Sequence, residues 1–120
     1  MATIKSFEDI ESWKKAREVC AVLGNIIDDG KFRKSYRLIN QIEGSSGSVM
    51  NNIAEGFERG TRAEFVQFLG YAKGSCGELR SQLYRAFDRK FITPKEFEDL
   101  KLLVLQTSGL IQNFIAYLQN

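Results

Sequence analysis

The sequence predicts an all-α fold, an antiparallel up-and-down four-helix bundle that forms a single domain over residues 1–120. Three observations support this prediction. Apolar residues recur at helical spacing in four segments, glycine-containing or capping stretches separate these segments, and no segment alternates with the period of a β-strand. Four helices of about 22–30 residues joined by short connections pack most simply as antiparallel neighbours. The length of 120 residues fits one domain.

The first two helices are delimited by short polar stretches. Ser6, with Asp9 three residues later, is expected to begin the first helix, and residues 28–31 (DDGK) to end it. Ser35 is positioned to cap the second helix. The apolar residues with helical spacing are Phe7, Ile10, Trp13, Cys20, Leu23 and Ile27 in the first segment, and Ile39, Ile42, Val49, Ile53 and Phe57 in the second.

The last two helices begin with clear capping signals. Thr61 with Glu64 predicts one capping box, following Gly60, which suits the end of the second helix. Thr93 with Glu96 predicts another, with the chain's one proline at the first helical position. The apolar residues are Phe65, Phe68, Leu69, Ala72, Leu79 and Leu83 in the third segment, and Phe97, Leu100, Val104, Leu110, Ile111, Phe114 and Leu118 in the fourth.

Glycines occur in the middle of the second and third helices, at Gly44, Gly47, Gly70, Gly74 and Gly77. Each costs about 1 kcal/mol relative to alanine in a helix interior, so a compensating role is expected. A turn at Gly60 would place Gly47 opposite Gly74, and Ser46 opposite Ser75. The glycines then permit either close pairing of the two helices or a contact with a subunit or ligand.

The sequence predicts no enzymatic activity, metal site, cofactor or small-molecule substrate. It contains no histidine, the commonest general base and metal ligand. Cys20 and Cys76 form no CxxC pair and are interpreted as small buried apolar residues. Ser12 and Lys15 match a Ser-x-x-Lys spacing on a charged helix, where no activated lysine or oxyanion hole is expected.

No apolar stretch suggests a membrane segment or secretory signal. The longest, near residues 102–105, is too short to cross a bilayer, and the N-terminus has no signal-like apolar region. The sequence therefore predicts a cytoplasmic protein.

Positive charge is concentrated in the middle of the chain. Residues 31–92 hold 11 Lys and Arg against 6 Asp and Glu, although the net charge is only +2. In an up-and-down bundle, two basic clusters meet at one end, which we call the basic pole: Lys31, Arg33, Lys34, Arg37, Arg85, Arg89 and Lys90. Cations at the end of the third helix complement its dipole, whereas cations at the start of the second oppose it. The basic pole is a candidate site for phosphates.

Four aromatic residues are expected near the basic pole: Phe32, Tyr36, Tyr84 and Phe87. They are candidates for stacking on unpaired bases, or for closing the end of the core.

A polar stripe runs along one face of the second helix. Ser48, Asn52, Glu55 and Arg59 fall at i, i+4, i+7 and i+11. The stripe is either a solvated or inter-helix face, or a polar contact with a subunit or partner. These four residues and Gly74 are the predicted oligomer interface.

The middle of the chain resembles a bacterial family of four-helix bundles, the 23S rRNA intervening-sequence proteins, some of which are labelled ribosomal proteins. The most distinctive part is residues 52–56 (NIAEG), within residues 48–59 (SVMNNIAEGFER). Further similarity lies at residues 64–65 (EF), 68–69 (FL) and 72–79 (AKGSCGEL). Gln41 and the opening pattern of Phe7, Ile10 and Trp13 also fit the family.

The resemblance implies a ring-like homopentamer of four-helix bundles. Genes of this family are found inside rRNA intervening sequences. A related branch of the family serves as the accessory protein of a retroelement reverse transcriptase. Two functional hypotheses follow. In the first, a non-enzymatic oligomer contacts RNA or a ribonucleoprotein through the basic pole. In the second, the oligomer is a protein-binding scaffold or accessory subunit that makes no direct contact with nucleic acid.

Overall fold

The computed structural model describes residues 4–30, 32 and 35–120. Its elements are a 3₁₀ turn, η1 (Phe7–Asp9), and four α-helices: α1 (Glu11–Asp28), α2 (Tyr36–Glu58), α3 (Arg62–Asp88) and α4 (Pro94–Gln119). The described residues contain no strand. The predicted all-α fold with four helices is confirmed. None of the described helices is long and apolar enough to cross a membrane.

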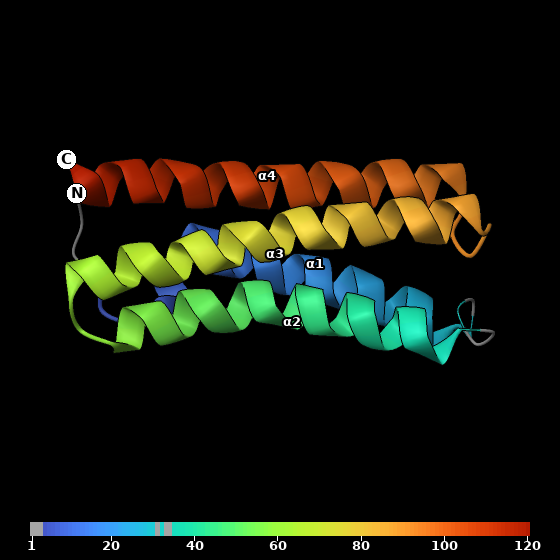
Figure 1. The fold of residues 1–120 in the computed structure, drawn as a ribbon, viewed down its shortest axis with the longest axis horizontal. Helices are drawn as coiled ribbons and strands as arrows, with labels where there is room; N and C mark the ends of the chain where they lie inside the picture. The colour runs from blue at the N-terminus through green and yellow to red at the C-terminus, as the bar shows by residue number, and fades with distance from the viewer. Residues whose placement is uncertain (1–3, 31, 33–34) are drawn as a thin grey trace.

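The helices form an elongated bundle of 44 × 21 × 19 Å. Each helix contacts its two neighbours around the bundle, so that α2 and α4 both lie against α1 and α3. Figure 1 shows α3 between α2 and α4, with α1 behind them. The C-terminus and the α2–α3 turn lie at one end, and the end of α1, the start of α2 and the α3–α4 connection lie at the other. The second end is therefore the predicted basic pole.

Three of the four predicted helix starts are confirmed. Ser35 Oγ accepts a hydrogen bond from the Leu38 amide at 3.3 Å. Thr93 and Glu96 form the full capping box, with Pro94 in the first turn. At α3, Thr61 Oγ1 accepts a hydrogen bond from the Glu64 amide at 3.2 Å and donates one to the Glu64 carboxylate at 2.9 Å. The Thr61 side chain therefore caps α3, which is one of the two interactions of the predicted capping box.

The predicted start of the first helix at Ser6 is wrong. Ser6 precedes η1, and its side chain makes no capping hydrogen bond with the described residues. Ile10 follows η1 in an extended conformation, with φ −78° and ψ 123°, and its side chain is buried. Burying Ile10 separates η1 from α1, so the helix begins at Glu11 and has only 18 residues.

The predicted pairing of glycines between α2 and α3 is also wrong. An added Cβ at Gly44, Gly47, Gly70, Gly74 or Gly77 would meet no described atom within 4 Å. The close approach occurs instead at Gly56, where an added Cβ would lie 2.6 Å from Phe68 Cβ. Ser75 Oγ donates to Ser48 Oγ at 3.0 Å, so Ser75 lies against Ser48 and not against Ser46.

Candidate nucleic-acid interface

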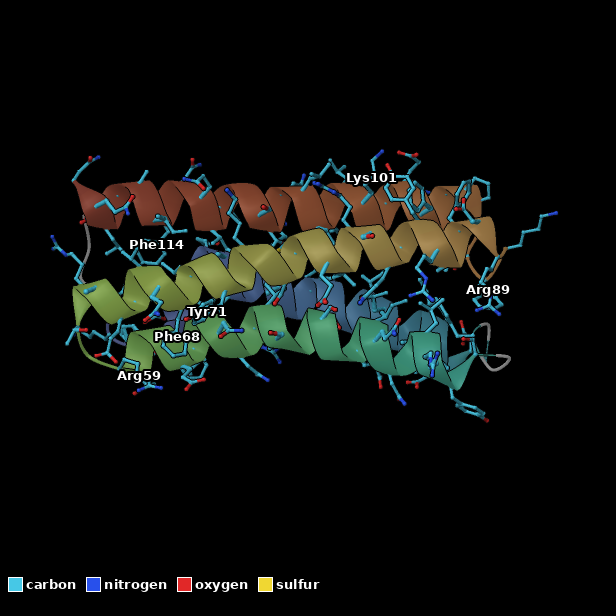
Figure 2. The ribbon with its side chains drawn as sticks, in the orientation of Figure 1. Arg59, Phe68, Tyr71, Arg89, Lys101 and Phe114 are labelled. Carbon is cyan, nitrogen blue, oxygen red and sulfur yellow. The ribbon has the colours of Figure 1, made fainter. Side chains whose placement is uncertain are left out.

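The basic pole is built where the end of α3 meets the start of α2. Of its seven predicted residues, the structure describes Arg37, Arg85, Arg89 and Lys90, all of them exposed. Lys31, Arg33 and Lys34 lie outside the described residues. Figure 2 shows Arg89 at the end of the bundle that carries the two connections.

Two arginines of α3 reach across to α2. Arg85 Nη1 donates to Gln41 Oε1 at 2.7 Å. Arg89 Nη1 donates to Ser35 Oγ at 3.3 Å, and its guanidinium lies 4.6 Å from the centre of the Phe91 ring. Ser35 is the N-cap of α2, so Arg89 is held at the start of that helix. These contacts orient both guanidinium groups while leaving the side chains exposed.

The start of α2 adds to the positive potential. Its first turn, which lies within the described residues, contains no acidic side chain. Helix N-termini carry partial positive charge and free amide groups that favour anions. Asp28 and Asp29 lie at the end of α1 and bring negative charge to the same pole. This arrangement suits a phosphate near Arg85 and Arg89.

The four aromatic residues at this pole divide into two kinds. Tyr36 and Tyr84 are exposed, by 73% and 45%. Phe32 is fully buried, with its ring centre 5.6 Å from that of Phe91. The Phe87 ring is stacked on Phe97 at 4.6 Å and is partly buried. The hypothesis that bases stack on Phe32 is therefore wrong, because the core covers its ring. Tyr36 and Tyr84 both present accessible rings.

Lys101 is a further cation that the sequence analysis missed. Its Nζ lies 5.8 Å from the centre of the Tyr84 ring and 5.6 Å from that of Phe97. Figure 2 shows Lys101 on α4, in the half of the helix nearer the two connections. Lys101 and Tyr84 lie on different helices, and the packing of α3 against α4 brings them together. The spacing of residues along the sequence therefore could not reveal this contact.

The predicted oligomer interface includes residues on the side of α2 that faces α3, where Ser48 accepts a hydrogen bond from Ser75. Ser48 and Asn52 are partly buried, and Asn52 Nδ2 donates to the Ser48 carbonyl and hydroxyl oxygens at 2.8 and 2.9 Å. Gly74 is exposed on α3. Its role and that of the polar stripe in assembly stay predictions.

Glu55 and Arg59, the other two residues of the stripe, lie near the α2–α3 turn. Arg59 pairs with Glu55 at 3.2 Å and with Glu64 at 3.6 Å. Its guanidinium also lies 4.9 Å from the centre of the Phe68 ring. The Arg59 side chain thus bridges the two helices at the end opposite the basic pole, as Figure 2 shows.

The candidate reactive groups have no activating surroundings. Ser12 Oγ is buried without a hydrogen-bond partner among the described residues, and Lys15 pairs with Glu18 at 3.3 Å. Burial raises the pKa of the Cys76 thiol to about 11, against a smaller lowering effect of Arg80. The described residues contain no group of three or more Cys, Asp or Glu side chains arranged to hold a metal ion. The burial of Cys76 and its raised pKa agree with its interpretation as an apolar core residue.

Comparison with known proteins identifies the family. The sequence model of the 23S rRNA-intervening sequence proteins matches residues 8–113. A solved structure from Bacteroides thetaiotaomicron VPI-5482, described as a protein of unknown function from the S23 ribosomal protein family, superposes with a TM-score of 0.77. It is 23% identical and the match covers 87% of this chain and 97% of that one, which establishes the shared fold. No curated protein matches significantly. The chain belongs to the 23S rRNA-intervening sequence protein family.

Proposed function

We propose that this protein is a non-enzymatic, cytoplasmic homo-oligomer that contacts RNA or a ribonucleoprotein through the basic pole. The observation that carries the proposal is the pair Arg85 and Arg89, held across the start of α2 by Gln41 and Ser35. Arginine pairs readily with phosphate through two parallel hydrogen bonds. Tyr36 and Tyr84 supply exposed rings at the same end of the bundle. Phosphate contacts and base stacking together are typical of proteins that bind single strands.

Neutralising the two arginines is expected to weaken RNA binding. The double variant Arg85→Gln/Arg89→Gln should bind a fluorescein-labelled single-stranded RNA of about 20 nucleotides at least tenfold more weakly than the wild type, a change of about 1.4 kcal/mol. The slope of log K against log salt should become shallower by about 0.7 for each phosphate that the variant no longer neutralises. Fluorescence anisotropy at several salt concentrations measures both quantities.

The matched control is Lys14→Gln/Arg17→Gln on α1, which removes the same net charge away from the basic pole. Its affinity should stay within about twofold of the wild type. Equal losses in both double variants would show non-specific attraction and remove the basic pole as the site. If the wild type binds neither single-stranded nor hairpin RNA at low salt, the protein-binding scaffold becomes the better hypothesis.

Removing the Tyr36 ring should weaken binding to single-stranded RNA selectively. The side chain is 73% exposed, so Tyr36→Ala leaves the core intact. Loss of one base–aromatic stack is expected to cost about 1–3 kcal/mol on single-stranded RNA and much less on a blunt duplex, whose bases are paired. The same titrations measure the effect, with Tyr117→Ala on the exposed surface of α4 as the control. Equal affinities for wild type and Tyr36→Ala on single-stranded RNA would exclude stacking at this ring.

A further inference from the structure

The connection between α3 and α4 borders an open cavity of about 770 Å³, which we call the α3–α4 cavity. Its volume lies in the range of about 300–1,000 Å³ that is typical of small-ligand pockets. Four apolar and two charged residues of its lining are Phe87, Phe91, Ile92, Pro94, Asp88 and Lys90. Glu96 also lines it, and its carboxylate accepts a hydrogen bond from the Thr93 amide in the α4 capping box. The cavity therefore combines an apolar surface with charged groups.

The backbone of Lys90 has an unusual conformation for a lysine. Its φ is 63°, and among the described residues no other non-glycine residue has a positive φ. Lys90 follows the end of α3, where the Phe91 amide donates to the Ala86 carbonyl, an arrangement that favours glycine. The chain has Gly30 and Gly60 at the equivalent positions after α1 and α2, with φ 79° and 87°. The helix ending itself therefore gives no reason for a lysine at this position, and a role of its side chain is expected.

The Asp88 carboxylate has no partner among the described residues, although basic residues surround it in the sequence. Asp88 is the last residue of α3 and is exposed, and its side chain forms no ion pair or hydrogen bond within the described part of the chain. Arg85 donates to Gln41, and Arg89 donates to Ser35. Both guanidinium groups are thus directed to α2. The Asp88 carboxylate is left beside the cavity as an available hydrogen-bond acceptor.

The α3–α4 cavity adjoins the cations of the basic pole. The Arg89 guanidinium lies 4.6 Å from the centre of the Phe91 ring, and Phe91 lines the cavity. Figure 2 shows Arg89 beside the connection that follows α3. Phe87 and Phe91 are only partly buried, so both rings keep accessible surface. A base in the cavity would contact these rings, with its phosphates near the cationic groups of Arg89 and Lys90. The cavity therefore suits a nucleotide better than a purely apolar molecule.

We propose that the α3–α4 cavity binds one unpaired guanine of an RNA strand, with Asp88 as the residue that selects the base. Unpaired bases are commonly recognised by hydrogen bonds to their Watson–Crick edge. On guanine this edge presents two adjacent donors, N1–H and the N2 amino group, which match the two oxygens of a carboxylate. Adenine and cytosine place an acceptor nitrogen beside their amino group, and uracil has two carbonyl groups, so each directs a lone pair at Asp88. The inference rests on the RNA contact in the proposed function.

The test compares the affinities for three short fluorescein-labelled RNAs that differ in one base. Each is a run of about nine uridines with guanine, adenine or hypoxanthine (the base of inosine) at its centre. The guanine RNA should bind at least about fivefold more tightly than the adenine RNA, the lower end of what a bidentate pair contributes to discrimination between bases. The hypoxanthine RNA, which lacks the N2 amino group, should bind with intermediate affinity. Fluorescence anisotropy at low salt measures all three.

Asp88→Asn should reduce the ratio of guanine to adenine affinity to within about twofold. The variant removes a negative charge, so electrostatics alone would strengthen binding, whereas loss of the carboxylate should weaken binding of the guanine RNA. Asp29→Asn is the matched control, because Asp29 is exposed at the end of α1 and does not line the cavity. It should keep the wild-type ratio. Far-UV circular dichroism checks that each variant is folded.

Lys90→Gly should weaken binding of all three RNAs by about threefold, because one phosphate contact is lost, and should leave the base preference unchanged. The melting temperature of this variant should rise, since glycine adopts the positive φ more readily. Wild-type affinity in Lys90→Gly would exclude a phosphate contact by this side chain and overturn the inference as stated.

The possible results distinguish the inference from the proposed function. Equal affinity of the wild type for the guanine and adenine RNAs, or an unchanged ratio in Asp88→Asn, overturns the guanine site. The basic pole still stands in that case if Arg85→Gln/Arg89→Gln weakens binding of every RNA. If the wild type binds none of the three RNAs at low salt, the RNA contact of the proposed function fails, and the inference fails with it.

Discussion

Replacing Phe32 by alanine is expected to lower the free energy of unfolding by about 3–5 kcal/mol, because the change removes a large, fully buried ring. The ring contacts Phe91 with a centre-to-centre distance of 5.6 Å. Phe32 follows α1 and Phe91 follows α3, so this contact joins the two connections beneath the basic pole. Urea denaturation followed by circular dichroism measures the change.

Tyr36→Ala provides the control for this experiment. Tyr36 lies four residues later and is 73% exposed, so its removal should change the free energy of unfolding by less than about 0.5 kcal/mol. A loss below about 1 kcal/mol for Phe32→Ala would contradict burial of the ring in solution. A large loss would also link stability to function, because Arg89 rests on the Phe91 ring that Phe32 supports.

Replacing Gly56 by alanine is expected to destabilise the bundle by about 1–3 kcal/mol, despite the better helix propensity of alanine. The new Cβ would lie 2.6 Å from Phe68 Cβ and 3.1 Å from Phe65 Cδ1. Phe68 Cβ is fixed to the α3 backbone, so the two helices must move apart. Thermal and urea denaturation measure the loss.

Gly44→Ala is the matched control, since Gly44 lies on the same helix and has open space at its Cβ position. This change should raise the free energy of unfolding by up to about 1 kcal/mol. Opposite signs at the two positions would confirm that α2 and α3 approach each other closely at Gly56. A stabilising Gly56→Ala would show that the helices are further apart in solution. Gly56 ends the NIAEG run, so close helix packing explains the glycine of that family-like string.

The sequence alone predicted the features that depend on short-range interactions. Capping of α2, α3 and α4 by Ser35, Thr61 and Thr93 was predictable because an N-cap bonds an amide only three residues away. The four helices followed from apolar spacing, which decides which side of a helix is buried. The contact of Arg89 at the end of α3 with Ser35 at the start of α2 agrees with the placement expected from short connections between antiparallel neighbours.

The tertiary structure decided the features that depend on contacts between distant residues. The α2–α3 turn and the Gly56–Phe68 approach set the helix register, so Ser75 meets Ser48 where the sequence suggested Ser46. Burial of Phe32 and the Lys101–Tyr84 contact likewise arise where elements far apart in sequence pack together. Local propensity carries no information about these distances, because they are fixed by side chains of other helices filling the space between them.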